Sequence, residues 1–331
     1  MSRFRTIVVV SDIHYASPAE QTRRGYESRP IHNPILRLLA KAYRHFIWLR
    51  DPFAHNALLD RFLDQAAGAD WLIANGDYSC DTAFVGVSDD AALASAAMCL
   101  SKLRGRFPDR CAAVFGDHEL GKMSLFGRCG GPRLASWRRA RTELALEPFW
   151  RLELGRYVLL GVVSSLVALP VYEPEALPDE LPEWRSLRAA HLEDICAAFA
   201  TLQQGQKLLL FCHDPTALPF LYQQEAVRAR LAQIEHTIIG HLHTGLIFWK
   251  SGLLAGMPAI GFLGNSVRRM STALRQAKLW QPFRVRLCPS LAGSELLKDG
   301  GYCSLRVDTE GGQTAQLRFH PLPRNPATAA R

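Results

Sequence analysis

The chain has 331 residues, of which 48% are hydrophobic and 21% charged, and its formal net charge is +8. This composition excludes an intrinsically disordered or collagen-like chain and is typical of a globular protein. The eight cysteines include no Cys-x-x-Cys pair, which argues against a zinc ribbon or a disulfide scaffold and favours reduced thiols in the cytosol.

Five short apolar runs, each followed by polar residues, form the main pattern of the chain. In chain order they are Thr6–Val10 before Asp12 and His14, Trp71–Ala74 before Asp77, Ala112–Phe115 before Asp117, His118 and Glu119, Lys207–Phe211 before His213, and Thr237–Ile239 before His241 and His243. Short apolar runs bounded by glycine and polar residues predict strands that are covered on both faces.

Helical periodicity separates these runs. It predicts helices at 56–67, 90–104, 186–203 and 223–234. We expect further strands at 157–163, 246–250, 258–263, 302–307 and 315–320. Alternating strands and helices predict an α/β fold in which polar side chains gather at the carboxyl ends of the strands.

The sequence shows no internal repeat and no convincing linker, so we expect one domain over residues 1–320. Segments 16–55, 170–184 and 266–300 look like insertions around its core, and 321–331 reads as a flexible tail.

Positive charge is concentrated in three segments. Net charge is +4 in 16–55, +6 in 120–142 and +6 in 266–286. Such segments suit an anionic partner, unless they are ordinary solvated loops.

The polar residues that follow the five runs are carboxylates and imidazoles, without thiolates. Oxygen and nitrogen ligands of this kind suit Mn²⁺, Fe²⁺ or Zn²⁺. Asp-x-His and Gly-Asp are common by chance, and a lone buried histidine is more often a core residue than a ligand. The combination of all five motifs, each at the end of an apolar run, favours a metal site.

In this order the motifs resemble those of the calcineurin-like metallophosphoesterase superfamily. Its pattern is Asp-x-His, Gly-Asp, Gly-Asn-His-Glu/Asp, His and Gly-His-x-His, and the resemblance covers roughly residues 6–245. It implies a β-sandwich flanked by helices, which agrees with the predicted strands and helices.

The resemblance also implies two metal ions bridged by Asp77, with Mn²⁺ favoured over Fe²⁺ or Zn²⁺. One ion would be held by Asp12, His14 and His243, and the second by Asp117, His213 and His241. His118 would be the catalytic histidine.

Two positions depart from the family pattern. Asp117 replaces the usual asparagine ligand, which keeps an oxygen and adds a negative charge. Some members also have an aspartate three residues after the bridging one to orient the catalytic histidine; here that residue is Cys80, and the nearest carboxylate is Asp81.

The implied chemistry is metal-dependent cleavage of phosphoesters. Two cations can activate water and neutralise phosphate charge, and His118 can give a proton to the leaving oxygen. Lys122 and Arg128 follow the catalytic loop and are candidates for substrate binding, unless they are ordinary surface residues.

Segment 35–50 is basic and amphipathic, with Arg37, Lys41 and Arg44 on one helical face. Such a helix either lies in a membrane interface or packs its apolar face on the core. A position in the interface predicts peripheral contact with the inner membrane face, because no signal peptide or spanning segment is visible in the sequence.

A helix in the membrane interface also predicts a lipid-linked substrate. The arrangement is similar to the cytosolic UDP-2,3-diacylglucosamine pyrophosphatases of lipid A biosynthesis. The sequence is also compatible with a soluble nucleotide phosphodiesterase or phosphatase, and with a non-catalytic member that binds lipid or nucleic acid. No specific nucleic-acid or protein partner is expected.

Overall fold

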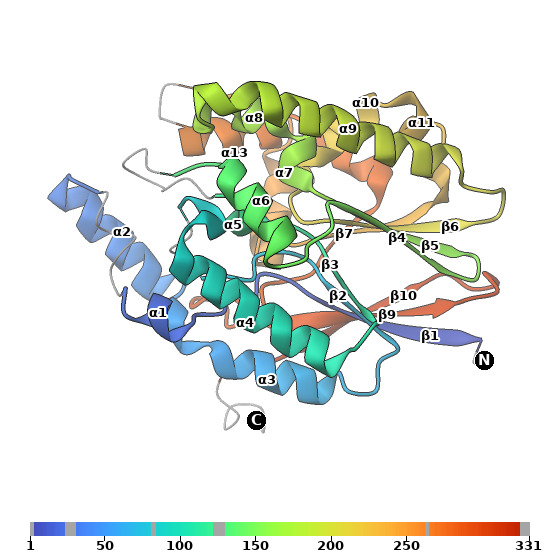
Figure 1. Cartoon of the computed structure of the whole chain (residues 1–331), viewed down its shortest axis with the longest axis horizontal. Helices are drawn as coiled ribbons and strands as arrows, with labels where there is room; N and C mark the ends of the chain where they lie inside the picture. Colours follow the sequence, from blue (N-terminus) through green and yellow to red (C-terminus); the bar gives the residue numbers. More distant parts are fainter. Residues whose placement is uncertain (1–2, 24–30, 81–83, 122–129, 262–264, 325–331) are drawn as a thin grey trace.

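The computed structural model describes residues 3–23, 31–80, 84–121, 130–261 and 265–324. Two five-stranded sheets, with strand orders β10-β9-β1-β2-β3 and β4-β5-β6-β7-β8, form its centre (Figure 1). Helices flank both sheets. The predicted α/β sandwich is therefore confirmed.

Each of the five apolar runs that precede the motifs becomes a strand. The strands are β1 (Phe4–Val10), β2 (Trp71–Ala74), β3 (Cys111–Ala113), β4 (Phe149–Leu154), β5 (Tyr157–Val162), β6 (Lys207–Cys212), β7 (Ile234–Ile239), β8 (Val285–Leu287), β9 (Gly301–Asp308) and β10 (Gln316–Pro321). β1, β2 and β3 are parallel to one another, as are β5, β6, β7 and β8. Parallel pairing brings the carboxyl ends of neighbouring strands to one edge of each sheet.

The helices lie mainly between these strands. They are α1 (Pro18–Gln21), α2 (Pro34–Phe46), α3 (Asn56–Gln65), α4 (Asp90–Arg106), α5 (Asp117–Leu120), α6 (Leu134–Thr142), α7 (Ser164–Val167), α8 (Leu169–Tyr172), α9 (Leu181–Ala200), α10 (Leu218–Gln223), α11 (Glu225–Arg228), α12 (Gly245–Leu253) and α13 (Asn265–Arg275). Short 3-10 helices cover Pro52–Ala54, Gly86–Ser88, Glu173–Glu175, Pro178–Glu180, Pro215–Ala217, Leu231–Gln233 and Ala277–Phe283.

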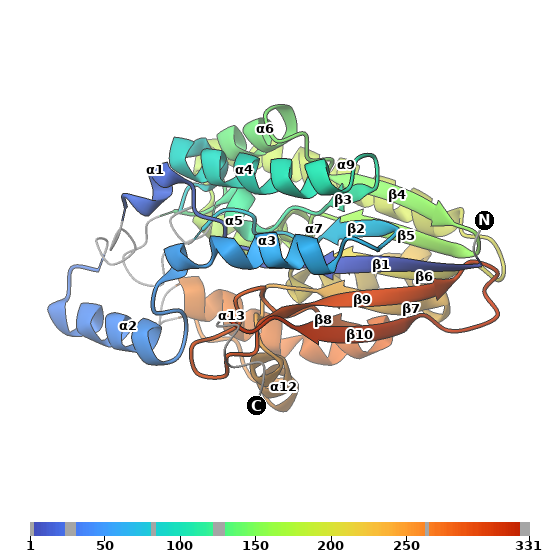
Figure 2. The same ribbon diagram turned by 90° about the horizontal axis from the view of Figure 1, so that it is seen from below.

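The core has three apolar layers, and this explains why the central strands are apolar without alternation. In β1, Ile7 and Val9 lie between the two sheets, whereas Val8 and Val10 pack with residues of α3 and α4. In β6, Leu209 faces the other sheet and Leu210 packs with residues of α9 and α10. Figure 2 shows α3 and α4 over the first sheet.

Two of the predicted strands are wrong. Residues 246–250 lie in α12, because the Thr244 hydroxyl accepts the N–H of Ile247 at 3.2 Å and caps a helix there. Residues 258–261 form no strand, and 262–263 lie outside the described residues.

The predicted helix at 223–234 is broken into α11 and a 3-10 turn. Within α11, which is fully described, Val227 is the sole buried residue. The segment therefore lacks the continuous apolar face that stabilises a longer helix.

The sequence did not predict β4 or β8. β8 comes from segment 266–300, so this expected insertion supplies an edge strand of the second sheet.

The start of the expected tail is also packed, since Leu322 is buried and its N–H donates to the carbonyl of Gly300 at 2.8 Å. Residues 325–331 lie outside the described residues.

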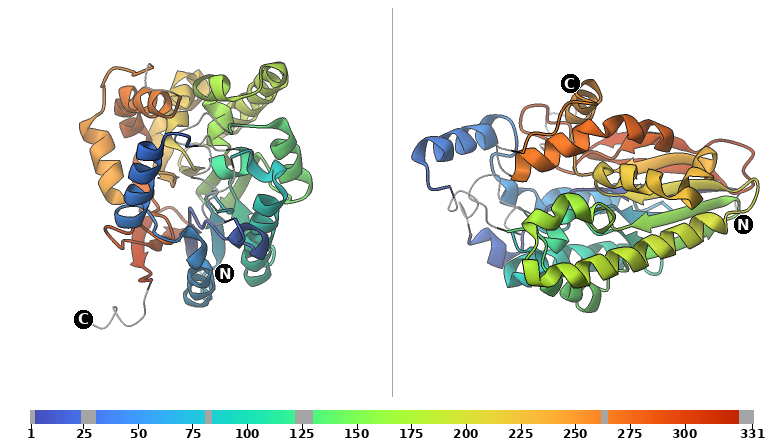
Figure 3. Two further views of the ribbon diagram at one scale, coloured as in Figure 1. Left: turned by 90° about the vertical axis from the view of Figure 1, so that its left-hand side faces the viewer. Right: turned by 90° about the horizontal axis from the view of Figure 1, so that it is seen from above.

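α2 extends away from the sandwich, at the end where β1 finishes (Figure 1; Figure 3, right). Among the described helices, none is long and apolar enough to cross a membrane.

Candidate metal centre

The side chains predicted from the five motifs converge at the carboxyl ends of β1, β2, β3, β6 and β7. Three overlapping groups can each hold a metal ion: Asp77, Asp117, His213 and His241; Asp12, His14 and His243; and His14, Asp77 and His118. Within each group one ligand atom per residue lies within 4.8 Å of the others. All eight side chains are buried except that of His241, which is half-buried.

One group joins the end of β1 to the loop after β7. The Nε2 atom of His243 lies 3.1 Å from Oδ1 of Asp12 and 3.4 Å from Nε2 of His14. The opposite ring nitrogen of His14, Nδ1, lies 3.2 Å from the carbonyl oxygen of Ser79. If Nδ1 donates to that carbonyl, Nε2 of His14 carries the lone pair that a cation needs.

A second group joins the first sheet to the second. Nε2 of His213 lies 3.1 Å from Oδ2 of Asp77 and 3.6 Å from Oδ1 of Asp117, which is 3.2 Å from Nδ1 of His241. Nδ1 of His213 lies 2.6 Å from the carbonyl oxygen of Asn75, which directs Nε2 toward the carboxylates.

The arrangement fits a bound cation. Within the described part of the chain, Nε2 of His213 and Oδ1 of Asp117 are buried atoms without a hydrogen-bond partner. Buried polar atoms are rarely left unpaired, and a metal ion would satisfy both.

The local electrostatics point the same way. Burial alone would lower the pKa of His213, but the charges of Asp77 and Asp12 hold this pKa well above its usual value. Burial also lowers the pKa of His241, but the charges of Asp214 and Asp117 outweigh burial and raise this pKa to about 9. Both shifts report a strongly negative potential, which attracts cations.

Five of the convergent residues have left-handed backbone conformations. Their φ angles are 50° for Asp12, 51° for His14, 60° for Asp77, 54° for His241 and 58° for His243. Non-glycine residues seldom adopt such values, and clusters of them occur at functional sites.

Two glycines allow the loops after β2 and β3 to approach each other. A Cβ on Gly116 would overlap the carboxylate of Asp77, and a Cβ on Gly76 would lie 2.6 Å from Nδ1 of His213. Glycine is therefore required at both positions by close approach.

Glu119 fixes the same pair of loops. Its Oε2 accepts the N–H groups of Gly116 at 2.7 Å and Asp77 at 3.1 Å, and its Oε1 accepts the N–H of Tyr78 at 2.9 Å. Burial and the charge of Asp77 raise the pKa of Glu119 to about 7. Glu119 thus acts on the shape of the site through Asp77.

Comparison with known proteins identifies the family. The family model for calcineurin-like phosphoesterases matches residues 5–245 of the chain. The chain belongs to the calcineurin-like phosphoesterase family. A search among curated proteins finds no match.

One solved structure shows the same fold, and a second is also matched. A dimetal phosphatase from Danio rerio is 12% identical, with a TM-score of 0.51 over 97% of this chain and 96% of that chain. A phosphopantetheinyl hydrolase from Mycobacterium tuberculosis is 15% identical, with a TM-score of 0.34 over 72% of this chain and 83% of that chain.

Calcineurin-like phosphoesterases use a dinuclear metal centre, and the groups around Asp77 have the composition that such a centre needs. Asp77 belongs to one group with His213 and to another with His14. It therefore lies between the two sets of ligands expected from the family pattern, as a bridging residue must.

The surroundings of His118 show what orients its ring in the absence of an aspartate at position 80. Nδ1 of His118 lies 3.2 Å from the carbonyl oxygen of Ser79 and 3.0 Å from that of Cys80. Nε2 lies 3.8 Å from Oδ2 of Asp77. Among the described residues, backbone carbonyls thus take the orienting role that an aspartate has in some phosphoesterases; Asp81 lies outside these residues.

Sequence reasoning missed a buried chain of polar residues behind His241. Oδ2 of Asp214 lies 3.8 Å from Nε2 of His241 and accepts the hydroxyl of Tyr172 at 2.5 Å. The guanidinium of Arg269 lies 5.2 Å from the Tyr172 ring and 3.4 Å from the carboxylate of Glu175. Asp214 follows a motif histidine directly and could have been found from the sequence.

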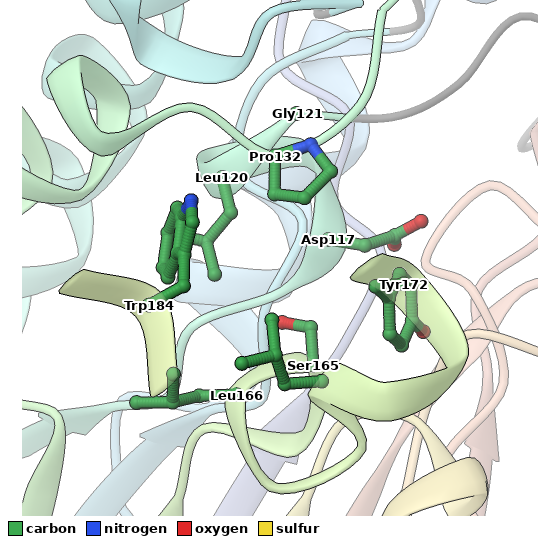
Figure 4. A pocket seen from close by; sticks show the side chains of 9 residues that line it. Asp117, Leu120, Gly121, Pro132, Ser165, Leu166, Tyr172 and Trp184 are labelled. Atoms are coloured by element: carbon green, nitrogen blue, oxygen red, sulfur yellow. The ribbon is translucent and has the colours of Figure 1, made fainter. Parts of the chain in front are cut away.

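A small hollow lies beside Asp117, with room for about one water molecule. Leu120, Leu166, Leu169 and Trp184 make its lining largely apolar (Figure 4). A second missed residue, Trp48, covers the other side of the centre: its ring centroid lies 4.4 Å from that of His243.

Lys122 and Arg128, predicted to bind substrate, lie outside the described residues.

Proposed function

We propose that this phosphoesterase cleaves phosphoester or pyrophosphate bonds with two divalent cations. The convergence of the eight Asp and His side chains, with Asp77 common to two groups, carries this proposal. Asp12, His14 and His243 would hold one ion, and Asp117, His213 and His241 the second. Ligands that are oxygen and nitrogen atoms only suit Mn²⁺, Fe²⁺ and Zn²⁺ alike, and among these we propose Mn²⁺.

When bound, two such cations activate water and neutralise charge on the phosphate. His118 then has the task of giving a proton to the leaving oxygen. Its Nδ1 faces the carbonyls of Ser79 and Cys80, so Nε2 is the atom that faces the substrate. Glu119 keeps the backbone of Asp77 in place, because its carboxylate accepts the N–H of Asp77.

We further propose a lipid-linked nucleotide, such as UDP-2,3-diacylglucosamine, as the favoured substrate. The basic face and the exposed apolar face of α2 support this, because a protein that lies on a lipid surface meets lipid-linked substrates there. The competing candidate is a soluble nucleotide phosphodiester, in which case the basic segments attract a small anion. The complete ligand set and the oriented His118 argue against a non-catalytic protein.

The test is a substrate panel with purified protein loaded with Mn²⁺. The panel contains a phosphomonoester, a cyclic nucleotide, a nucleotide sugar and UDP-2,3-diacylglucosamine. Asp77→Ala protein, prepared in the same way, is the control for contaminating hydrolases. Preferred cleavage of the lipid-linked compound supports the finer proposal, and preferred cleavage of a water-soluble compound favours the soluble phosphodiester. Failure to bind metal and to cleave any compound would refute the proposed function.

A further inference from the structure

α2 has an apolar face and a basic face. Arg37, Lys41 and Arg44 lie on one side of the helix at a spacing of three to four residues. Apolar side chains occupy the opposite side, as in helices that lie at a membrane surface. The helix begins at a well-formed cap, since the side chain of Asn33 accepts the N–H groups of Ile35 and Leu36.

The apolar face is not covered by the rest of the described chain. No residue of α2, which is described over its whole length, is buried. The exposed fractions are 68% for Ile35, 68% for Leu38, 59% for Leu39 and 65% for Phe46. Of the two alternatives for this segment, packing of the apolar face on the core is therefore wrong for the described structure.

The apolar surface continues beyond the helix. Ile47 and Leu296 are both exposed, and the N–H of Leu296 donates to the carbonyl of Ile47 at 3.2 Å. Exposed apolar patches of this extent are unusual on a globular protein unless another molecule covers them.

The end of α2 is fixed to the metal centre. Leu49 is buried, and the carbonyl of Trp48 accepts the N–H of Glu295. The Trp48 ring packs against His243 on one side, and its centroid lies 6.3 Å from that of Tyr43 in the last turn of α2. A surface that binds α2 would therefore be held next to the catalytic end of the sandwich.

We propose that α2 anchors the protein to an anionic lipid bilayer by inserting its apolar face. Segment 31–50 contains four lysine or arginine residues and no acidic residue, which suits an anionic surface. A second copy of the chain fits less well, because a symmetric contact would bring two such basic segments together. The anchor does not depend on the proposed metal ions.

The experiment measures sedimentation with lipid vesicles in the presence of EDTA, so that catalysis does not enter. Vesicles of phosphatidylglycerol and phosphatidylethanolamine are compared with vesicles of phosphatidylcholine. One variant replaces the apolar face (Ile35→Gln, Leu38→Gln, Phe46→Gln), and a second reverses one charge (Lys41→Glu). The control variant replaces exposed apolar residues far from α2 in the sequence (Met98→Gln, Leu177→Gln).

Wild-type and control protein should bind the anionic vesicles, and added salt should weaken binding. The apolar-face variant should lose at least about 100-fold in partitioning, because three large side chains no longer leave water. Lys41→Glu should lose about tenfold or more. All variants should unfold at the wild-type temperature, since the replaced side chains are exposed.

Absence of vesicle binding by wild-type protein at low salt would overturn the proposal. So would unchanged binding by the apolar-face variant. Light scattering that shows a wild-type dimer and a monomeric apolar-face variant would instead assign α2 to contact between two copies. The substrate panel tests catalysis separately, so failure of the anchor and failure of the proposed hydrolysis can be told apart.

Discussion

Asp12, His14 and Asp77 hold backbone conformations that each cost about 1–3 kcal/mol in a non-glycine residue. The surrounding hydrogen bonds keep them there: Asp12 accepts the N–H of His241 at 3.1 Å, and the N–H of Asp77 donates to Glu119 at 3.1 Å. The sequence predicted which side chains come together here. It did not predict their left-handed conformations, because these depend on contacts between loops far apart in the chain.

The close approach of Gly116 to Asp77 yields a prediction. Gly116→Ala should lower the free energy of unfolding and abolish metal binding, since the added Cβ overlaps the Asp77 carboxylate. The control is Gly105→Ala in α4, where an added Cβ meets no described atom within 4 Å. This change should stabilise the helix by about 0.5–1 kcal/mol. Urea unfolding and elemental analysis distinguish the two, and a Gly116→Ala protein with full metal content would contradict the geometry.

His118→Asn should keep both metals and lose activity by about 10²–10⁴-fold, the usual contribution of general acid–base catalysis. The reason is that His118 faces the centre through Nε2 and is proposed to act on the leaving group. The measurement is the turnover number together with metal content. If turnover stays at the wild-type value, His118 has a structural role.

Asp117→Asn should leave activity within about tenfold of wild type, because both side chains present an oxygen to the metal. The change removes one negative charge beside His241 and His213. Steady-state kinetics of the Mn²⁺-loaded variant test this. Complete inactivity with metal still bound would mean that the second carboxylate oxygen of Asp117 takes part in the reaction.

At the scale of elements, strands covered on both faces were predictable and edge strands were not. β1 and β6 are continuous apolar runs because helices cover one face and the opposite sheet the other. β4 is only partly buried and contains Arg151 and Glu153, so its sequence gives no continuous run. α2 could not be placed from its own residues, since the same amphipathic pattern suits a core or a membrane.

α9 carries a titratable group with a predictable effect on stability. Nε2 of His191 accepts the N–H of Val163 at 3.1 Å, and burial lowers the pKa of His191 to about 4. Between pH 6.5 and 4 the unfolded chain binds a proton that the folded chain does not. The stabilising contribution is therefore complete above pH 6.5 and is lost as the pH falls, by about 2 kcal/mol at pH 5.

His191→Gln can still accept the N–H of Val163 and does not titrate. The free energy of unfolding should fall less for this variant than for wild type between pH 7.5 and pH 5. Urea midpoints at the two pH values measure the loss in each protein. The effects of the other titrating groups cancel when the two losses are subtracted, because both proteins contain these groups. Equal losses in the two proteins would show that His191 is already protonated in the folded state.

At the scale of the whole molecule, the proposed ligands come from both sheets. Asp12, Asp77 and Asp117 follow β1, β2 and β3, whereas His213 and His241 follow β6 and β7. The order of the motifs allowed this convergence to be predicted. The contacts of Trp48, Tyr172 and Arg269 with the site could not be, because they arise from segments that looked like insertions.

Metal binding should therefore stabilise the entire fold. At a free metal concentration about 1,000 times the dissociation constant, one bound ion adds about 4 kcal/mol to the free energy of unfolding. The melting temperature should rise on loading with Mn²⁺ and return with EDTA. Asp77→Ala should lose most of this shift, and His14→Ala a smaller part. If the melting temperature of wild-type protein does not change when metal is added, binding of metal across the two sheets is contradicted.

The packing of the two sheets against each other also determines at which stage of folding activity can appear. Neither sheet alone carries either of the two predicted ligand sets, because each set needs a histidine that follows β6 or β7, so a chain with only one sheet formed would lack the dinuclear centre. The proposed hydrolysis would thus be restricted to molecules in which the two sheets have packed together. Occupancy of both metal positions would then report on completed packing, because a copy with only one sheet formed would lack the dinuclear centre.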